Sequence, residues 1–116
     1  MTVSHLRLLS LASCFLLLPS ALLAQAGVAS LTGQVTDPSG AILVGAQVTE
    51  TNIETQTARS TVTDRSGNFT FVGLPVGHYR VAVVQSGFQA QEATLMLDPS
   101  ERARQDFHMA VSSMTT

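Results

Sequence analysis

The feature that most constrains this chain is a series of short runs in which apolar and polar residues alternate. From Gly27 onward these runs recur roughly every 8 to 15 residues, with turn sequences between them. Runs rich in Thr, Val, Phe and Tyr at such spacing are typical of an all-β sandwich or barrel, and no window sustains the 3.6-residue period of an amphipathic helix. The pattern predicts seven strands, over residues 30–36, 42–51, 57–63, 68–72, 78–85, 88–97 and 102–110.

Two of the turn sequences follow the same chemistry. Asp37-Pro38-Ser39-Gly40 fits a type I turn, because Asp caps the backbone, Pro sets φ at the second position and Gly stands at the fourth; Asp64-Arg65-Ser66-Gly67 repeats this logic. Calcium binding is the alternative, but each turn offers one carboxylate where six to eight oxygen ligands are needed. We therefore expect both Asp side chains to cap their own turns.

The strand faces define a core. Residues 78–85 are apolar on both faces, which predicts a central strand covered on both sides. Residues 57–63 are mostly Thr, so we expect an edge strand there, with Ala58 and Val62 on one face and Thr61 facing outward. Inward parity elsewhere collects the large side chains Phe69, Phe71, Tyr79, Val81, Val83 and Phe107. Two packed sheets are the natural closure, so the predicted fold is a seven-stranded antiparallel β-sandwich.

The amino-terminal residues have the pattern of a secretory signal. A weakly basic start precedes an apolar run over residues 8–18, and Ala24-Gln25-Ala26 supplies the small residues read by a signal peptidase. We expect a signal peptide over residues 1–26, a domain over 27–110 and a frayed tail over 111–116. The expected location is therefore exported: periplasmic, secreted or associated with the outer membrane.

Two alternatives to cleavage before Gly27 remain. Residues 8–24 approach the ~17–25 residues that can span a bilayer, so a retained anchor is one. The other is a lipoprotein signal at Leu11-Ala12-Ser13-Cys14, although the apolar run continues past that cysteine. With cleavage before Gly27, we expect no membrane insertion of the mature chain.

Charge argues against one class of partner, and the cysteine content excludes a disulfide as a source of stability. The chain has six basic residues, all arginine, and eight acidic ones. All but one of the arginines and all of the acids follow residue 26, which argues against a nucleic-acid partner. Cys14 is the single cysteine and lies in the signal region, so the mature domain must be held by packing and the sheet ladder rather than by a disulfide.

The residues that carry enzyme chemistry are missing from the expected domain. His78 and His108 lack acidic residues at ligand spacing, and there is neither a Gly-x-Ser-x-Gly motif nor a mature cysteine. We expect no catalytic residue, no metal and no cofactor. Sugar binding normally needs exposed aromatic rings, and the one candidate ligand contact is Phe88, which follows Gly87 at the start of a run. A place in the core is the favoured interpretation of this ring.

An ordered set of motifs resembles the carboxypeptidase regulatory-like domain family. The set spans about residues 30–109 and consists of Gly33-Gln34-Val35-Thr36-Asp37, Gly45-Ala46-Gln47-Val48, Thr63-Asp64 with Gly67-Asn68-Phe69, Leu74-Pro75 with Gly77-His78-Tyr79, and Gly87-Phe88. The resemblance implies a prealbumin-like (transthyretin-like) sandwich. It also implies a relation to the amino-terminal extension of TonB-dependent outer-membrane receptors and, through carbohydrate-binding-like folds, to sugar-binding modules.

These observations favour a non-enzymatic structural or protein-interaction module of the cell envelope, acting alone or as a truncated relative of a TonB-dependent receptor. An exposed edge over residues 57–63 would accept a partner strand by β-augmentation. A carbohydrate-binding module is the alternative, and it rests on the family relation and on Phe88.

Overall fold

A computed structural model describes residues 27–113, in which every regular element is a strand. The signal-peptide prediction falls on residues 1–26, outside the described residues, and stays a prediction. Within residues 27–113 there is no helix long and apolar enough to cross a membrane. The strands are β1 (Val28–Thr36), β2 (Gln47–Asn52), β3 (Ala58–Val62), β4 (Asn68–Pro75), β5 (Gly77–Val84), β6 (Gln91–Leu97), β7 (Arg102–Arg104) and β8 (Phe107–His108).

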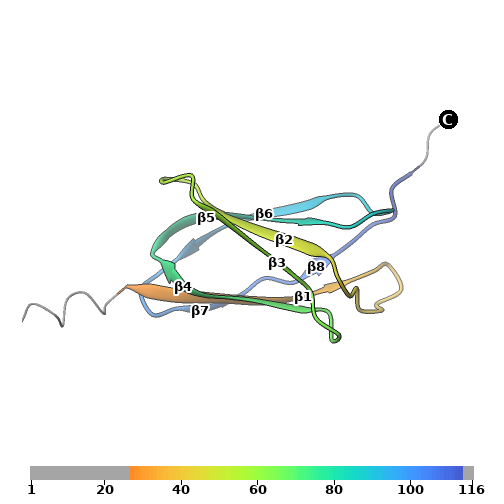
Figure 1. Ribbon diagram of the computed structural model, residues 1–116, viewed down its shortest axis with the longest axis horizontal. Helices are drawn as coiled ribbons and strands as arrows, with labels where there is room; N and C mark the ends of the chain where they lie inside the picture. Colours follow the sequence, from red (N-terminus) through yellow and green to blue (C-terminus); the bar gives the residue numbers. More distant parts are fainter. Residues whose placement is uncertain (1–26, 114–116) are drawn as a thin grey trace, which may run out of the picture.

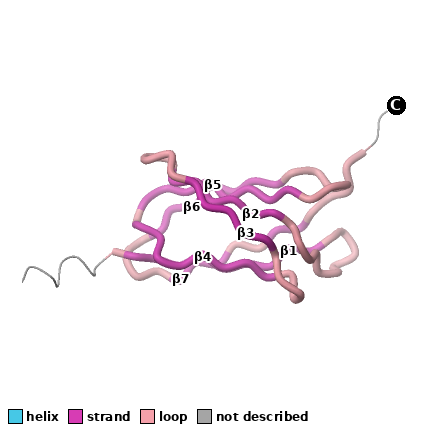
Figure 2. Tube along the Cα trace, in the orientation of Figure 1, coloured by secondary structure: helices cyan, strands magenta, loops and turns pink. Residues whose placement is uncertain are grey.

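The strands form two sheets that pack face to face, so the predicted two-layer sandwich is confirmed. One sheet has the order β4-β1-β7, with β8 also paired to β1; the other has the order β3-β2-β5-β6. Figure 1 shows the two layers, and Figure 2 shows the loops that join them at both ends. The edge strands β3 and β4 contact each other across the gap between the sheets.

The core lies between the sheets and follows the predicted parity. Phe69 packs against Phe71 and Phe107, with ring centroids 6.1 and 6.2 Å apart. Tyr79 is 1% exposed, and its hydroxyl donates to the carbonyl oxygen of Pro75 at 2.6 Å, which satisfies the one polar atom of this large side chain. The other buried apolar side chains are Ala29, Leu31, Val35, Ala46, Val48, Leu74, Val81, Val83, Leu97 and Met109.

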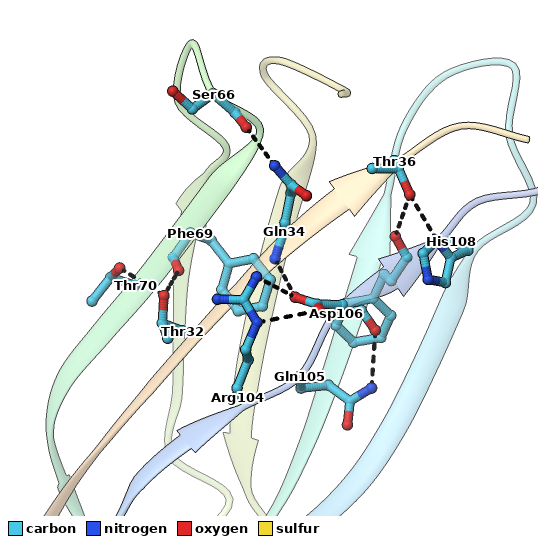
Figure 3. A network of polar contacts seen from close by, with 11 residues as sticks. Thr32, Gln34, Thr36, Ser66, Phe69, Thr70, Arg104, Gln105, Asp106 and His108 are labelled. Atoms are coloured by element: carbon cyan, nitrogen blue, oxygen red, sulfur yellow. Dashed lines mark hydrogen bonds and ion pairs between the residues drawn. The ribbon is translucent and has the colours of Figure 1, made fainter. Parts of the chain in front are cut away.

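The last predicted strand, residues 102–110, is two strands, which makes eight strands instead of seven. β7 and β8 pair with β1 in parallel, because the chain crosses from β6 to the other sheet and enters it beside the start of β1, where the Ser100 amide donates to the Val28 carbonyl. Between them, the Asp106 carboxylate accepts the Gln34 amide at 2.9 Å in place of a backbone carbonyl (Figure 3). A side chain thus interrupts the ladder, and the all-antiparallel prediction is wrong for this edge.

Two other strands begin later than predicted. Of the segment 42–51, only the part from Gln47 onward is a strand, and Ile42 forms a single bridge with Thr36. The Thr63 hydroxyl holds the intervening segment by donating to the Leu43 carbonyl and accepting the Ala46 amide. β6 likewise begins at Gln91 rather than at residue 88.

β5 is central, as predicted, since it lies between β2 and β6. It is covered on one face only: Val84, on the other face, is 54% exposed, because the outer face of this sheet meets solvent. The frayed tail was expected to start at residue 111, but Val111 bridges to Phe88 and the Ser112 amide donates to the Gly87 carbonyl. Ordered pairing therefore extends at least to Ser112.

β3 is an edge strand, as predicted, but its faces are the reverse of those expected. Thr61 lies opposite Val48, which is fully buried, so Thr61 faces inward; Val62 lies opposite Gln47 and is 60% exposed. The sequence parity failed here because a Thr-rich strand has no strong apolar face, and the pairing with β2 decides its orientation.

Candidate functional site

The side of the sandwich where β3 and β4 meet carries a buried carboxylate. Glu50 lies on the inner face of β2, between the positions of Val48 and Asn52, and is 2% exposed. A charged group in such a place must be paired or change its protonation. Glu50 therefore marks this side of the molecule as unusual.

Arg59, directly opposite Glu50 in the β2–β3 ladder, provides the pairing. Its Nε lies 3.0 Å from Glu50 Oε1, and its Nη2 donates to the Val72 carbonyl oxygen at 2.9 Å. Val72 belongs to β4, so one guanidinium joins the edges of both sheets. The second carboxylate oxygen, Oε2, is buried and has no hydrogen-bond partner among the described residues. Burial raises the pKa of the Glu50 carboxyl, and the Arg59 guanidinium offsets only part of that effect.

A pocket of about 490 Å³ adjoins this pair, within the range of small-molecule sites. Its apolar wall comes from the end of β4 and the start of β5, and its polar wall from β2 and the loop before β3. The lining residues are Glu50, Asn52, Glu54, Thr55, Thr57, Arg59, Leu74, Pro75, Val76, Gly77 and Tyr79.

The polar wall is held by a capped loop. Asn52 Oδ1 accepts the amides of Glu54 and Thr55, each at 3.0 Å, and Gln56 takes a positive φ of 62° to close the loop. The Glu54 carboxylate lies 2.6 Å from His78 Nδ1 and accepts the His78 amide, and these bonds to His78 lower the pKa of Glu54. Glu54 thus has hydrogen-bond partners, whereas Glu50 Oε2 has none within the described part of the chain.

The outer side of β3 is an open strand edge. The Asn52 amide donates to the Thr57 carbonyl, so antiparallel alternation makes Glu50–Arg59 and Val48–Thr61 the hydrogen-bonded pairs. The N–H and C=O groups of Ala58, Ser60 and Val62 therefore point away from β2. No backbone group elsewhere in residues 27–113 bonds to them.

The predicted side chains are placed in different parts of the molecule. His78 is exposed beside Glu54. His108 belongs to β8 in the other sheet, and its Nδ1 lies 2.7 Å from the Thr36 hydroxyl (Figure 3). No group of three or more potential metal-ligating side chains occurs within residues 27–113. Phe88 is half-buried against the core and does not line the pocket, so its ring offers a ligand only part of its surface.

Both Asp side chains cap their turns, as predicted. Asp37 Oδ1 accepts the amides of Ser39 and Ala41, at 2.8 and 3.0 Å, together with the Ser39 hydroxyl. Asp64 Oδ1 accepts the amides of Ser66 and Asn68 at 2.8 and 3.0 Å. The Ser39 hydroxyl is the largest cause of the lowered pKa of Asp37.

Sequence reasoning missed Glu50 and Arg59. The alternation that places Val48 inward also places Glu50 inward two residues later, so a signal was present. No such signal identified Arg59, because its position opposite Glu50 depends on the β2–β3 register, which the intervening loop sets.

The comparisons with known proteins agree with this fold. A sequence model of the carboxypeptidase regulatory-like domain matches residues 30–110, most of the chain. The chain belongs to this family. The family match confirms the resemblance drawn from the five motifs, and family membership identifies the sandwich as prealbumin-like. The search among curated proteins found no match.

Solved structures show the same fold at low identity. The Bacillus anthracis TIE protein is 20% identical with a TM-score of 0.64, over 73% of this chain and 17% of its own. Catechol 1,2-dioxygenase of Acinetobacter radioresistens is 12% identical with a TM-score of 0.64, over 78% of this chain and 54% of its own. 3-Chlorocatechol 1,2-dioxygenase of Rhodococcus opacus 1CP is 12% identical with a TM-score of 0.60, over 74% of this chain and 61% of its own. The chain thus spans only part of each protein, and the likeness concerns the sandwich alone.

Proposed function

We propose that this carboxypeptidase regulatory-like domain is a non-enzymatic protein-interaction module of the cell envelope, which takes up a partner strand at the edge of β3. The observation that carries the proposal is the open edge itself, where Ala58, Ser60 and Val62 present backbone groups that nothing in residues 27–113 pairs. Main-chain hydrogen bonds of this kind give β-augmentation its affinity.

The side chains of β3 leave its edge open to a partner strand and do not block it. Edge strands are normally guarded by charges, prolines or bulges. The outward-facing side chains of β3 are Ala58, Ser60 and Val62, none of them charged, and the charged Arg59 is turned inward onto Glu50. The neighbouring edge of β4 differs, because Arg59 already occupies its Val72 carbonyl.

The envelope location rests on the secretory pattern of residues 1–26 and on the resemblance to receptor extensions. Under this proposal the domain docks onto another envelope protein, either alone or as one piece of a TonB-dependent receptor. The absence of a Cys nucleophile or a Gly-x-Ser-x-Gly motif from residues 27–113 supports a role without catalysis.

Photocrosslinking in the exporting cell tests the proposal. A photoreactive side chain at Val62 is compared with one at Met96, which lies on β6 at the opposite edge of the same sheet and is similarly exposed, at 56% against 60%. We expect a discrete crosslinked partner from position 62 and none from position 96. Equal labelling from both positions, or none from position 62, would reject the β3 edge as the docking site.

A further inference from the structure

The pocket beside β3 contains a buried acceptor without a donor. Glu50 lines the pocket, its side chain is only 3% exposed, and its Oε2 has no hydrogen-bond partner in the part of the chain that the structure describes. A buried carboxylate oxygen without a donor costs free energy, so a donor that reaches it is favoured.

Arg59 is not free to supply that donor. Its Nε is engaged with Glu50 Oε1 and its Nη2 with the Val72 carbonyl, which holds the guanidinium on one side of the carboxylate. The terminal torsion of a Glu side chain is broad, so the carboxylate can turn Oε2 toward a ligand without leaving its rotamer. The missing donor must then come from outside residues 27–113.

The rest of the pocket indicates which donor fits. Two carboxylates, Glu50 and Glu54, line it against one arginine, so a positive charge is favoured over a neutral or negative one. Glu54 is exposed and also bonds to His78, so Glu50 is the stronger attraction. Leu74, Pro75 and Val76 form an apolar wall along the same pocket. A volume of about 490 Å³ admits a short aliphatic stem as well as the charged head.

We propose that this pocket binds a primary ammonium group on a short aliphatic stem, with the ammonium donating to Glu50 and the stem lying against Leu74, Pro75 and Val76. The site is separate from the open backbone edge of β3, so the two proposals stand or fall independently. Ser60→Pro removes an edge amide and the hydroxyl bond to Thr49, neither of which lines the pocket, so it is expected to leave amine binding unchanged.

Titration of the exported protein with pentylamine, followed by amide chemical shifts, tests the proposal, with 1-pentanol and pentanoate as matched probes. We expect saturable shifts for residues 52–57 and 74–79 with pentylamine only. Glu50→Gln keeps the shape and removes the charge, and is expected to weaken binding at least tenfold. Glu92→Gln is the control, because it removes a carboxylate from the exposed ion pair with Arg80; its affinity should stay within twofold.

A second variant decides the question if Glu50→Gln does not fold. Thr57 is exposed and lines the pocket, so Thr57→Lys brings an ammonium into it from the chain itself. We expect Thr57→Lys to lose pentylamine binding and to unfold at higher urea than Thr57→Met, which adds a similar stem without charge. Equal pentylamine affinity in wild type and Glu50→Gln, comparable binding of 1-pentanol, or equal urea midpoints for the two Thr57 variants would overturn the proposal.

Discussion

Removing the positive charge of Arg59 should reveal what the buried Glu50 contributes to stability. Arg59→Met keeps the aliphatic stem but deletes the group 3.0 Å from Glu50 Oε1 and 2.9 Å from the Val72 carbonyl. Breaking a buried ion pair by removing one partner typically costs about 3–5 kcal/mol, because the remaining charge is stranded. The pocket beside Glu50 admits water, and Arg59 is 45% exposed, so we expect the lower end, about 3 kcal/mol at neutral pH.

The loss should depend on pH with a defined sign. The folded-state pKa of Glu50 is raised above its ordinary value of 4.5, so stability from this group is fully present below pH 4.5 and is lost as pH rises through the folded pKa. Arg59→Met removes the one influence that lowers this pKa, so its pH dependence is steeper than that of wild type. As pH falls below 4.5 the carboxyl becomes protonated in both proteins, so the cost of the substitution should fall toward about 1 kcal/mol, the value of the lost bond to Val72.

Urea unfolding at pH 7 and pH 4 measures both quantities. With a urea m-value of about 1 kcal/mol per molar for a domain of this size, a 3 kcal/mol loss lowers the midpoint by about 3 M at pH 7. The double variant Glu50→Met/Arg59→Met removes the stranded charge and should recover most of the loss. A midpoint within 0.5 M of wild type at pH 7, or an equal loss at both pH values, would refute this account of the pair.

Three further outcomes follow from the packing and the turns. Phe71→Ala should cost about 3–5 kcal/mol in urea unfolding, whereas Val62→Ala, on the exposed face of β3, should change stability by less than about 0.5 kcal/mol; similar losses would mean the faces are wrong. Gly33→Ala places a Cβ in collision with the Gln105 carbonyl oxygen, so amides of β7 and β8 should lose hydrogen-exchange protection while β2 and β5 keep theirs. The pKa of Asp37 is lowered, so its turn loses stabilisation as pH falls through that pKa, below 3.8. The amides that Asp37 caps should exchange faster there than the same amides in Asp37→Asn measured at the same pH. Equal exchange in the two proteins would reject the cap.

The sequence predicts the core of the fold well because large apolar side chains leave little choice of face. Phe69, Phe71 and Tyr79 can satisfy the alternation of their strands in one register only, since a one-residue slip would expose all of them. The two Asp turns were equally clear, because the chemistry of each turn lies within five consecutive residues.

The parts that could not be predicted depend on contacts between distant residues. The interruption of the last strand follows from a bond between the Asp106 side chain and the Gln34 amide, 72 residues away. The faces of β3 follow from its pairing with β2, and the burial of Glu50 becomes tolerable only because that pairing brings Arg59 opposite it. The alternation along β2 already turns Glu50 inward, and the Thr-rich run already predicts an edge at residues 57–63. The register between β2 and β3, and with it the pocket, emerges only from the structure.

The most direct test of the central claim is to remove one outward-facing amide from β3 and measure partner capture. The Ser60 N–H points away from β2, so Ser60→Pro deletes an edge donor at a position where an edge strand tolerates proline. Ser60→Ala is the matched control that loses only the hydroxyl bond to Thr49. With the photoreactive group at position 62, we expect Ser60→Pro to abolish the crosslinked adduct and Ser60→Ala to retain it, with both proteins folded by circular dichroism. An undiminished adduct from folded Ser60→Pro would contradict strand addition at the β3 edge.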